Sequence, residues 1–187
     1  MKTLLTDLAM VNSGVYAKPE LNGEVYYIQA RDITANHEFS ENLSPQLIAD
    51  GRIDKHFLQP GDLLIAAKGK DHYAIEYKGY PSPAVASTIF IVVRIKDKGN
   101  VLPPFVQWYI NLPRIQMSLA GGAQGSVVPV ISKAHLESLE IPLVPIEKQT
   151  FILKIDALRQ REIELTNQIE SLRSKQIEQE LLNAISN

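Results

Sequence analysis

The C-terminal forty residues predict one long helix whose apolar seam needs a partner. Ile146 to Ile185 contains no Pro and no Gly, so no residue there would kink or end a helix. Apolar residues recur at heptad spacing, and the seam that we predict for dimerisation consists of Ile155, Leu158, Leu165, Ile169 and Leu172. A coiled coil buries such a seam, whereas an isolated helix leaves it in water. The pattern predicts a C-terminal coiled-coil spacer and dimerisation helix over residues 146–187, after a globular domain over residues 1–145.

Two positions on the same seam are polar, Glu162 and Gln176. Such residues are either tolerated in a seam or, when buried, fix the register and orientation of the helices. Both interpretations remain open at this point. The helix itself would be about 60 Å long.

The remaining sequence indicates an α+β domain with many short strands and a few helices. Runs that are typical of strands cover residues 25–28, 63–66, 73–77, 87–95, 127–131 and 139–144. Pro103 opens a predicted helix, a second short helix covers residues 113–120, and Ser132 is a predicted N-cap. Residues 1–24 are interrupted by Gly and Pro and are predicted to be irregular.

The charge is unevenly distributed along the chain. The net charge is −2, although a nucleic-acid binder is usually basic. Residues 1–67 hold five Lys/Arg against nine Asp/Glu, residues 68–133 hold eight against three, and residues 134–187 hold six against nine. The middle third is therefore the candidate for an electropositive face, and the alternative is chance scatter.

The sequence contains no convincing enzyme motif. Residues 120–125 nearly match a dinucleotide fingerprint but follow a predicted helix instead of a strand. Residues 102–105 resemble a methyltransferase tetrapeptide, but Leu102 cannot accept the required hydrogen bond. The chain has no cysteine and four scattered histidines, which excludes disulfides and thiolate zinc sites. We therefore predict a non-catalytic chain without cofactor or metal.

The composition also bears on the compartment. The absence of cysteine agrees with a reducing cytoplasm. No apolar run approaches the ~18 residues of a membrane span, and residues 1–10 lack the apolar core of a signal peptide. We expect a cytoplasmic protein that does not span a membrane.

An ordered series of segments resembles the specificity subunits of type I restriction–modification systems. Pro60-Gly61-Asp62-Leu63-Leu64-Ile65-Ala66, with Lys68-Gly69 after it, is similar to the family signature "pGDlLia..G". Further matches in the same order are Gly14, Tyr27 to Ile33, Thr88 to Arg94, Pro104 to Ile110, Gly125 to Ser132, and Leu139 to Gln149. The resemblance covers nearly the whole chain, and its specificity comes from the ordered set.

The resemblance implies a DNA target recognition domain followed by a conserved spacer helix. Such a subunit does no chemistry: it reads half of a bipartite DNA site and docks methyltransferase subunits, and a restriction (translocase) subunit joins for cleavage. Family members usually carry two recognition domains and two helices, whereas this chain has one of each and resembles a half-subunit.

A half-subunit with an unpaired helix predicts a homodimer. Antiparallel pairing would place the two domains at opposite ends and favour an inverted repeat with half-sites several base pairs apart. A helix from another specificity subunit is the alternative partner. The alternative function is a structural or decoy protein that binds methyltransferase subunits without useful DNA affinity.

Candidate DNA contacts come from the positive segment and the glycine-rich loop. Basic residues suit phosphate, and amide or backbone donors suit phosphate or base edges. The alternatives are solvated surface charges and an ordinary flexible loop. The candidates are Lys68, Gly69, Lys70, His72, Arg94, Lys96, Gln124, Gly125, Ser126 and Lys133.

Overall fold

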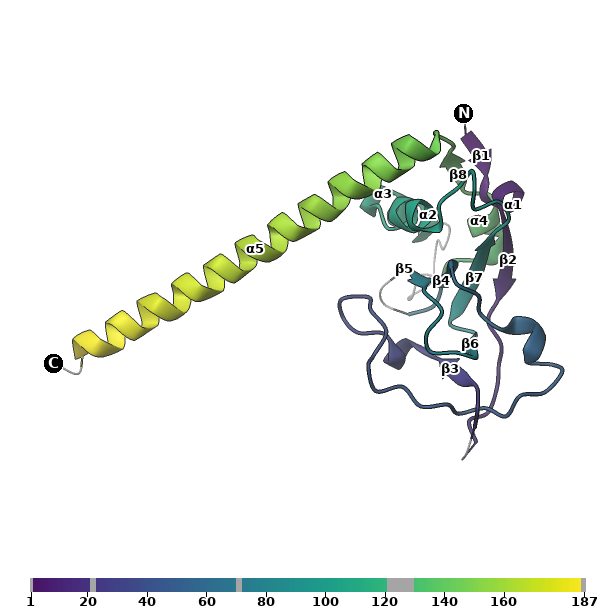
Figure 1. The fold of residues 1–187 in the computed structure, drawn as a ribbon, viewed down its shortest axis with the longest axis horizontal. Helices are drawn as coiled ribbons and strands as arrows, with labels where there is room; N and C mark the ends of the chain where they lie inside the picture. The colour runs from purple at the N-terminus through teal and green to yellow at the C-terminus, as the bar shows by residue number, and fades with distance from the viewer. Residues whose placement is uncertain (1, 21–22, 70–71, 121–129, 186–187) are drawn as a thin grey trace. The chain divides into compact units, whose positions relative to one another are not determined.

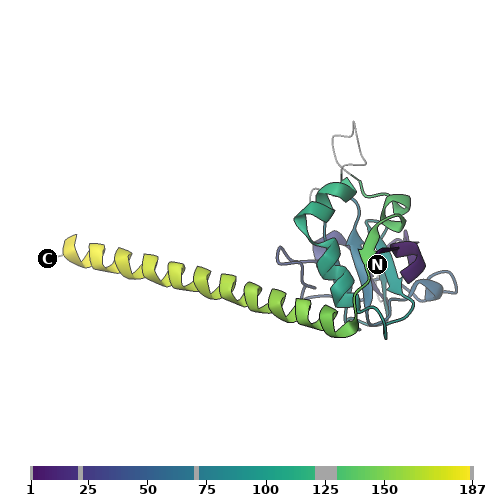
Figure 2. The same cartoon turned by 90° about the horizontal axis from the view of Figure 1, so that it is seen from above.

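The computed structural model describes residues 2–20, 23–69, 72–120 and 130–185. The chain forms two compact units, Met1–Ile146 and Glu147–Asn187. The first is a mixture of short strands and helices, and the second is the long helix α5, which spans Ile146–Ile185 (Figure 1). The predicted α+β class with a long C-terminal helix is confirmed. Figure 2 shows α5 as one uninterrupted helix.

A four-stranded antiparallel sheet forms the centre of the first unit. Its strand order is β2-β7-β4-β5, with bounds Ala9–Ser13, Phe90–Ile95, Asp62–Ala66 and Ala74–Tyr77. All five residues of β4 are buried because both faces of the sheet are covered. This accounts for the continuous apolar run in its sequence.

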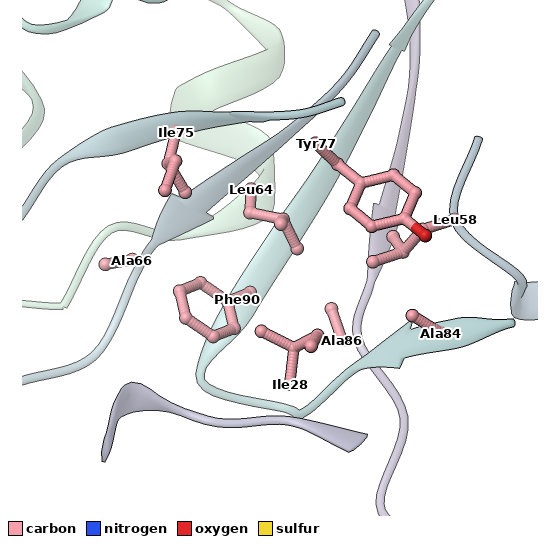
Figure 3. Close-up of a cluster of buried hydrophobic side chains, with 9 residues drawn as sticks. All are labelled: Ile28, Leu58, Leu64, Ala66, Ile75, Tyr77, Ala84, Ala86 and Phe90. Carbon is pink, nitrogen blue, oxygen red and sulfur yellow. The ribbon is translucent and has the colours of Figure 1, made fainter. Parts of the chain in front are cut away.

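One face of the sheet packs on a cluster that includes the small parallel pair β3–β6. β3 spans Tyr26–Ile28, and β6 spans Ala84–Ala86. Figure 3 shows the cluster, which consists of Ile28, Leu58, Leu64, Ala66, Ile75, Tyr77, Ala84, Ala86 and Phe90. Leu63 and Ile65 have the opposite parity on β4 and are also fully buried, so they lie on the other face.

Helices cover that other face. α2 spans Pro103–Ile110 and contacts β4 and β5 (Figure 1). Its first residue is a proline, which suits a position whose N–H has no helical partner. α3 spans Pro113–Ala120, and α4 spans Lys133–Glu137 behind Ser132, whose hydroxyl accepts from the His135 N–H at 3.1 Å. The predicted N-cap is therefore confirmed.

The prediction that residues 1–24 are irregular was wrong. They contain β1 (Lys2–Leu4), α1 (Leu5–Leu8) and β2. β1 pairs with β8 (Glu140–Pro142), and β2 pairs with β7. Both partners lie far along the chain, so local sequence signals could not indicate these strands.

Two other strand predictions need correction. In the run 87–95, regular strand begins only at Phe90, because the Phe90 N–H turns back to the Ser87 carbonyl at 2.9 Å. Val130 and Ile131 are not in a strand, and residues 127–129 lie outside the described residues. Two short 3₁₀ helices, η1 (Ala30–Asp32) and η2 (Asp54–His56), complete the unit.

Gly14 is required by a close approach of two backbones. A Cβ atom at this position would lie 2.1 Å from the Ser87 carbonyl oxygen. The Gly14 N–H donates to the Phe90 carbonyl at 2.9 Å. Any side chain here would therefore separate the segment after β2 from the start of β7.

The half-buried Glu76 on β5 gives the domain a pH-dependent stability. Burial raises the pKa of the Glu76 carboxyl above its ordinary 4.5, and Lys78 and Lys98 partly oppose the shift. The folded state therefore binds the proton more tightly, and stability falls as pH rises through the folded pKa. We expect Glu76→Gln to raise the free energy of unfolding at pH 7 but not at pH ~4. Urea titrations at both pH values would show it, and an equal effect at both would contradict this assignment.

Candidate nucleic-acid interface

Three segments that are distant in sequence meet where β4 ends. The Ala67 N–H donates to the Ile89 carbonyl, just before β7, at 3.0 Å. The Ala67 carbonyl accepts from the Ile131 N–H at 2.9 Å. Ile131 is the second described residue after the glycine-rich segment 121–129. The basic loop after β4 and the end of that segment are therefore neighbours in space.

Lys68 and Gly69 form the exposed start of this basic loop. Lys68 is exposed, and within the described ranges its ammonium has no hydrogen-bond or ion-pair partner. Gly69 has a φ of 125°, a conformation that strains any residue with a side chain. The loop thus turns sharply away from β4 and leaves one lysine charge in water, where a phosphate could reach it.

His72 faces the strand instead of the solvent. Its Nδ1 lies 2.9 Å from the Ala66 carbonyl oxygen, and because a carbonyl only accepts, Nδ1 carries the hydrogen in this contact. Its Nε2 is buried and has no hydrogen-bond partner among the described residues. The ring therefore holds the loop against β4, and its contribution to binding would be to position that loop.

A hollow of about 340 Å³ separates the basic loop from residues 30–37. Across it, the ring of His37 stacks on Tyr73, with centroids 4.2 Å apart and planes 16° from parallel. His37 is exposed and has a φ of 58°, an uncommon conformation for a residue with a side chain. We call Thr34–His37, Lys68–Gly69 and His72–Tyr73 the β4–β5 loop surface.

Sequence reasoning did not identify His37. A lone histidine in a polar loop gives no signal by itself, and its stacking partner belongs to another loop. Only the path of the chain brings the two rings together at the rim of the hollow.

Arg94 lies at the opposite end of β7 and is engaged within the fold. Its Nε donates to Asp62 Oδ1 at 2.7 Å, and its Nη2 donates to Asp62 Oδ2 at 2.6 Å and to the Phe57 carbonyl at 2.9 Å. The Asp62 side chain is 0 % exposed and the Arg94 side chain is 24 % exposed. The hydrogen bonds to Asp62 raise the pKa of Arg94. The structure therefore gives Arg94 a structural role, which replaces the phosphate contact that we predicted from its charge.

Lys96 and Lys133 are also separate from the β4–β5 loop surface. The Lys96 ammonium donates to the Thr6 carbonyl at 2.8 Å, just beyond the far end of β7. Lys133 begins α4 and lies 3.7 Å from Glu137. Lys96 therefore connects the N-terminal segment to β7, whereas Lys133, two residues after Ile131, stays near the loop end of the sheet.

Four predicted DNA contacts lie outside the described residues. They are Lys70, Gln124, Gly125 and Ser126. The structure therefore brings together Lys68, Gly69 and His72, and it separates Arg94 and Lys96 from them.

The predicted seam of α5 is exposed along its whole length. The exposed fractions are 52 % for Ile155, 67 % for Leu158, 42 % for Leu165, 49 % for Ile169 and 65 % for Leu172. The polar surface of the helix carries short-range ion pairs, such as Arg161 to Glu164 at 3.0 Å. A helix of forty residues with this much apolar surface is typical of an interaction element.

Among residues 2–20, 23–69, 72–120 and 130–185, no helix has the length and apolar content needed to cross a membrane. Within the same ranges, no group of three or more His, Asp or Glu residues is placed to hold a metal ion.

Comparison with protein families gives one match that covers most of the chain. Residues 5–179 match the model described as type I restriction modification DNA specificity domain. No curated protein sequence matches the chain.

Solved structures show the same fold at low sequence identity. The HsdS subunit from Thermoanaerobacter tengcongensis is 21 % identical, with a TM-score of 0.66, over 89 % of this chain and 44 % of that one. A chain from a study of complex assembly and conformational transition of the type I R-M system is 18 % identical, with a TM-score of 0.67, over 89 % and 44 %. The S subunit from M. genitalium is 15 % identical, with a TM-score of 0.56, over 88 % and 40 %. The chain thus spans less than half the length of these structures.

Proposed function

The chain belongs to the family of type I restriction modification DNA specificity domains, and from this premise we propose that it reads one half of a bipartite DNA site. The family match over residues 5–179 carries the proposal. In this proposal residues 1–145 are the target recognition domain and residues 146–187 the spacer. The chain does no chemistry itself: it docks methyltransferase subunits, and a restriction subunit can join the complex.

We place the DNA contacts on the β4–β5 loop surface. Lys68 has a free charge in the described structure, and Gly69 gives its loop a turn toward solvent. Lys70, Gln124, Gly125 and Ser126 belong to the same proposal on sequence grounds, and Lys133 lies nearby. Arg94 and Lys96 are left out because their donors are engaged within the fold.

We propose further that α5 pairs with α5 of a second copy in antiparallel orientation. A parallel pair would place Glu162 opposite its own copy inside the seam, where two carboxylates repel. An antiparallel pair places each Glu162 opposite a leucine and permits compensation by arginine. Two-fold symmetry then implies an inverted repeat in the DNA, and a helix of another specificity subunit is the alternative partner.

A test of DNA reading combines Lys68→Ala with Lys70→Ala. Each lysine that contacts phosphate adds about one to the slope of log affinity against log salt. We expect the double variant to bind DNA at least about ten-fold more weakly, with a shallower slope, in a gel shift with the methyltransferase subunit present. Lys78→Ala is the matched control, since Lys78 is exposed at the other end of β5.

Methylation-sensitive sequencing of a host that carries the chain and its methyltransferase tests the function directly. We expect modified bases in a split inverted repeat. Binding without any sequence preference would contradict the proposal. Methyltransferase binding without DNA binding would instead favour the structural or decoy function, which the net charge of −2 favours.

A further inference from the structure

The last turns of α5 carry apolar residues on a different face from the seam. After Leu172 the seam positions are polar: Gln176, Gln179 and Asn183. Ile177, Leu181 and Ile185 recur instead at every fourth residue and are 58, 61 and 81 % exposed. At about 100° per residue, these three point roughly 130° away from the seam. We call them the tail face, and a helix that buries the seam leaves it uncovered.

The change of face coincides with the end of the helix overlap. In an antiparallel pair the numbers of facing residues have a constant sum. A sum of 320 sets Phe151 against Ile169 of the partner copy and Ile155 against Leu165. A sum of 327 would set Phe151 against the polar Gln176. With 320, residue 174 is level with residue 146 of the partner, so residues 177–185 extend about 4 to 16 Å past the start of the partner's helix.

A groove lies in the first unit at that same point. Its volume is about 420 Å³. The apolar lining residues are Leu8, Val101, Leu143, Val144, Pro145 and Ile146. Four of these six immediately precede or begin α5. The groove therefore opens where a partner helix, after passing along the seam, would extend beyond the first turn of α5.

We infer that this groove binds the tail face of α5 from a second copy. The inference rests on the proposed antiparallel pairing and extends it to a second contact. Apolar side chains that the seam cannot bury would leave water in a mostly apolar groove, which is favourable. Two-fold symmetry gives each dimer two tails and two grooves, so the contact closes without exposing a further surface. Such a contact would fix the register of the spacer from both ends.

Cross-linking of the full chain tests this contact. The chain has no native cysteine, so introduced thiols are the sole sites for a short bismaleimide. We expect Leu143→Cys with Leu181→Cys to give a covalent dimer. The matched control is Leu143→Cys with Asn183→Cys, because Asn183 lies two residues away on the opposite side of the helix. We expect at least about ten-fold less product from the control.

Light scattering on the same samples separates the two hypotheses. A dimer in which the Leu181 and Asn183 variants cross-link equally, or neither does, would overturn the groove contact and leave the seam intact. A monomer throughout would overturn the homodimer itself. In a second measurement, Leu181→Asp should weaken the dimer about ten-fold or more, since a buried leucine is lost twice per dimer. Asn183→Asp should leave the dimer unchanged, and equal weakening by both would contradict the inference.

Discussion

Replacing Asp62 by Ala is expected to lower the free energy of unfolding of the recognition domain by about 3 kcal/mol or more. The Asp62 carboxylate is fully buried and accepts from Arg94 and from the Gln59 N–H at 2.8 Å. Without it, the Arg94 guanidinium keeps only the Phe57 carbonyl among these partners, and a largely buried charge is left without its counterion. Urea unfolding monitored by tryptophan fluorescence would measure the loss, because Trp108 is the one tryptophan in the chain.

Two further variants identify the cause. Asp50→Ala breaks an exposed ion pair with Arg52 and should leave the midpoint unchanged, because solvent screens such pairs. Asp62→Leu combined with Arg94→Met should recover much of the stability, since removing both charges avoids an unpaired one. A small loss in Asp62→Ala, or an equally large loss in Asp50→Ala, would contradict this account.

Replacing Leu158 and Leu165 by Asp is expected to convert the chain from a dimer to a monomer of 20.9 kDa. The change removes two leucines per chain, and so four per dimer, from the seam. At about 1.5 to 3 kcal/mol for each leucine, the dissociation constant should rise at least a thousand-fold. Sedimentation or light scattering measures the mass, and helicity should fall as well because an isolated helix is marginal in water.

The control for the seam places the same charge on the outer side of α5. Gln160→Asp with Asn167→Asp alters residues that lie away from the seam in the heptad and should leave the dimer intact. An unchanged dimer in the leucine variant would show that the seam is not the interface. A wild-type chain that is monomeric at high concentration would contradict the pairing proposal altogether.

The structure also explains the family signature around Pro60-Gly61-Asp62. The sequence indicates a turn followed by a buried strand, and β4 begins at Asp62 as that pattern predicts. The reason for the acidic residue becomes visible only in three dimensions, where its carboxylate closes the turn through Gln59 and binds Arg94. A residue that resembles a polar turn residue is thus a buried structural anion.

What the sequence determined by itself is local. The bounds of α5 follow from a heptad pattern without Pro or Gly, and the capping of α4 follows from Ser132, because helix formation and capping depend on residues within one or two turns. The resemblance to the specificity subunits also needed only the order of segments along the chain.

The tertiary structure alone decided which charges are free and which are used. Arg94 and Lys68 have the same formal charge in the same positive segment, yet one is bound to Asp62 and the other faces water. β1 pairs with β8, and His37 stacks on Tyr73, through contacts between segments remote in sequence. Such contacts depend on the path of the whole chain, because pairing and desolvation are set by what the fold brings within a few ångströms. Local composition carries no record of that path.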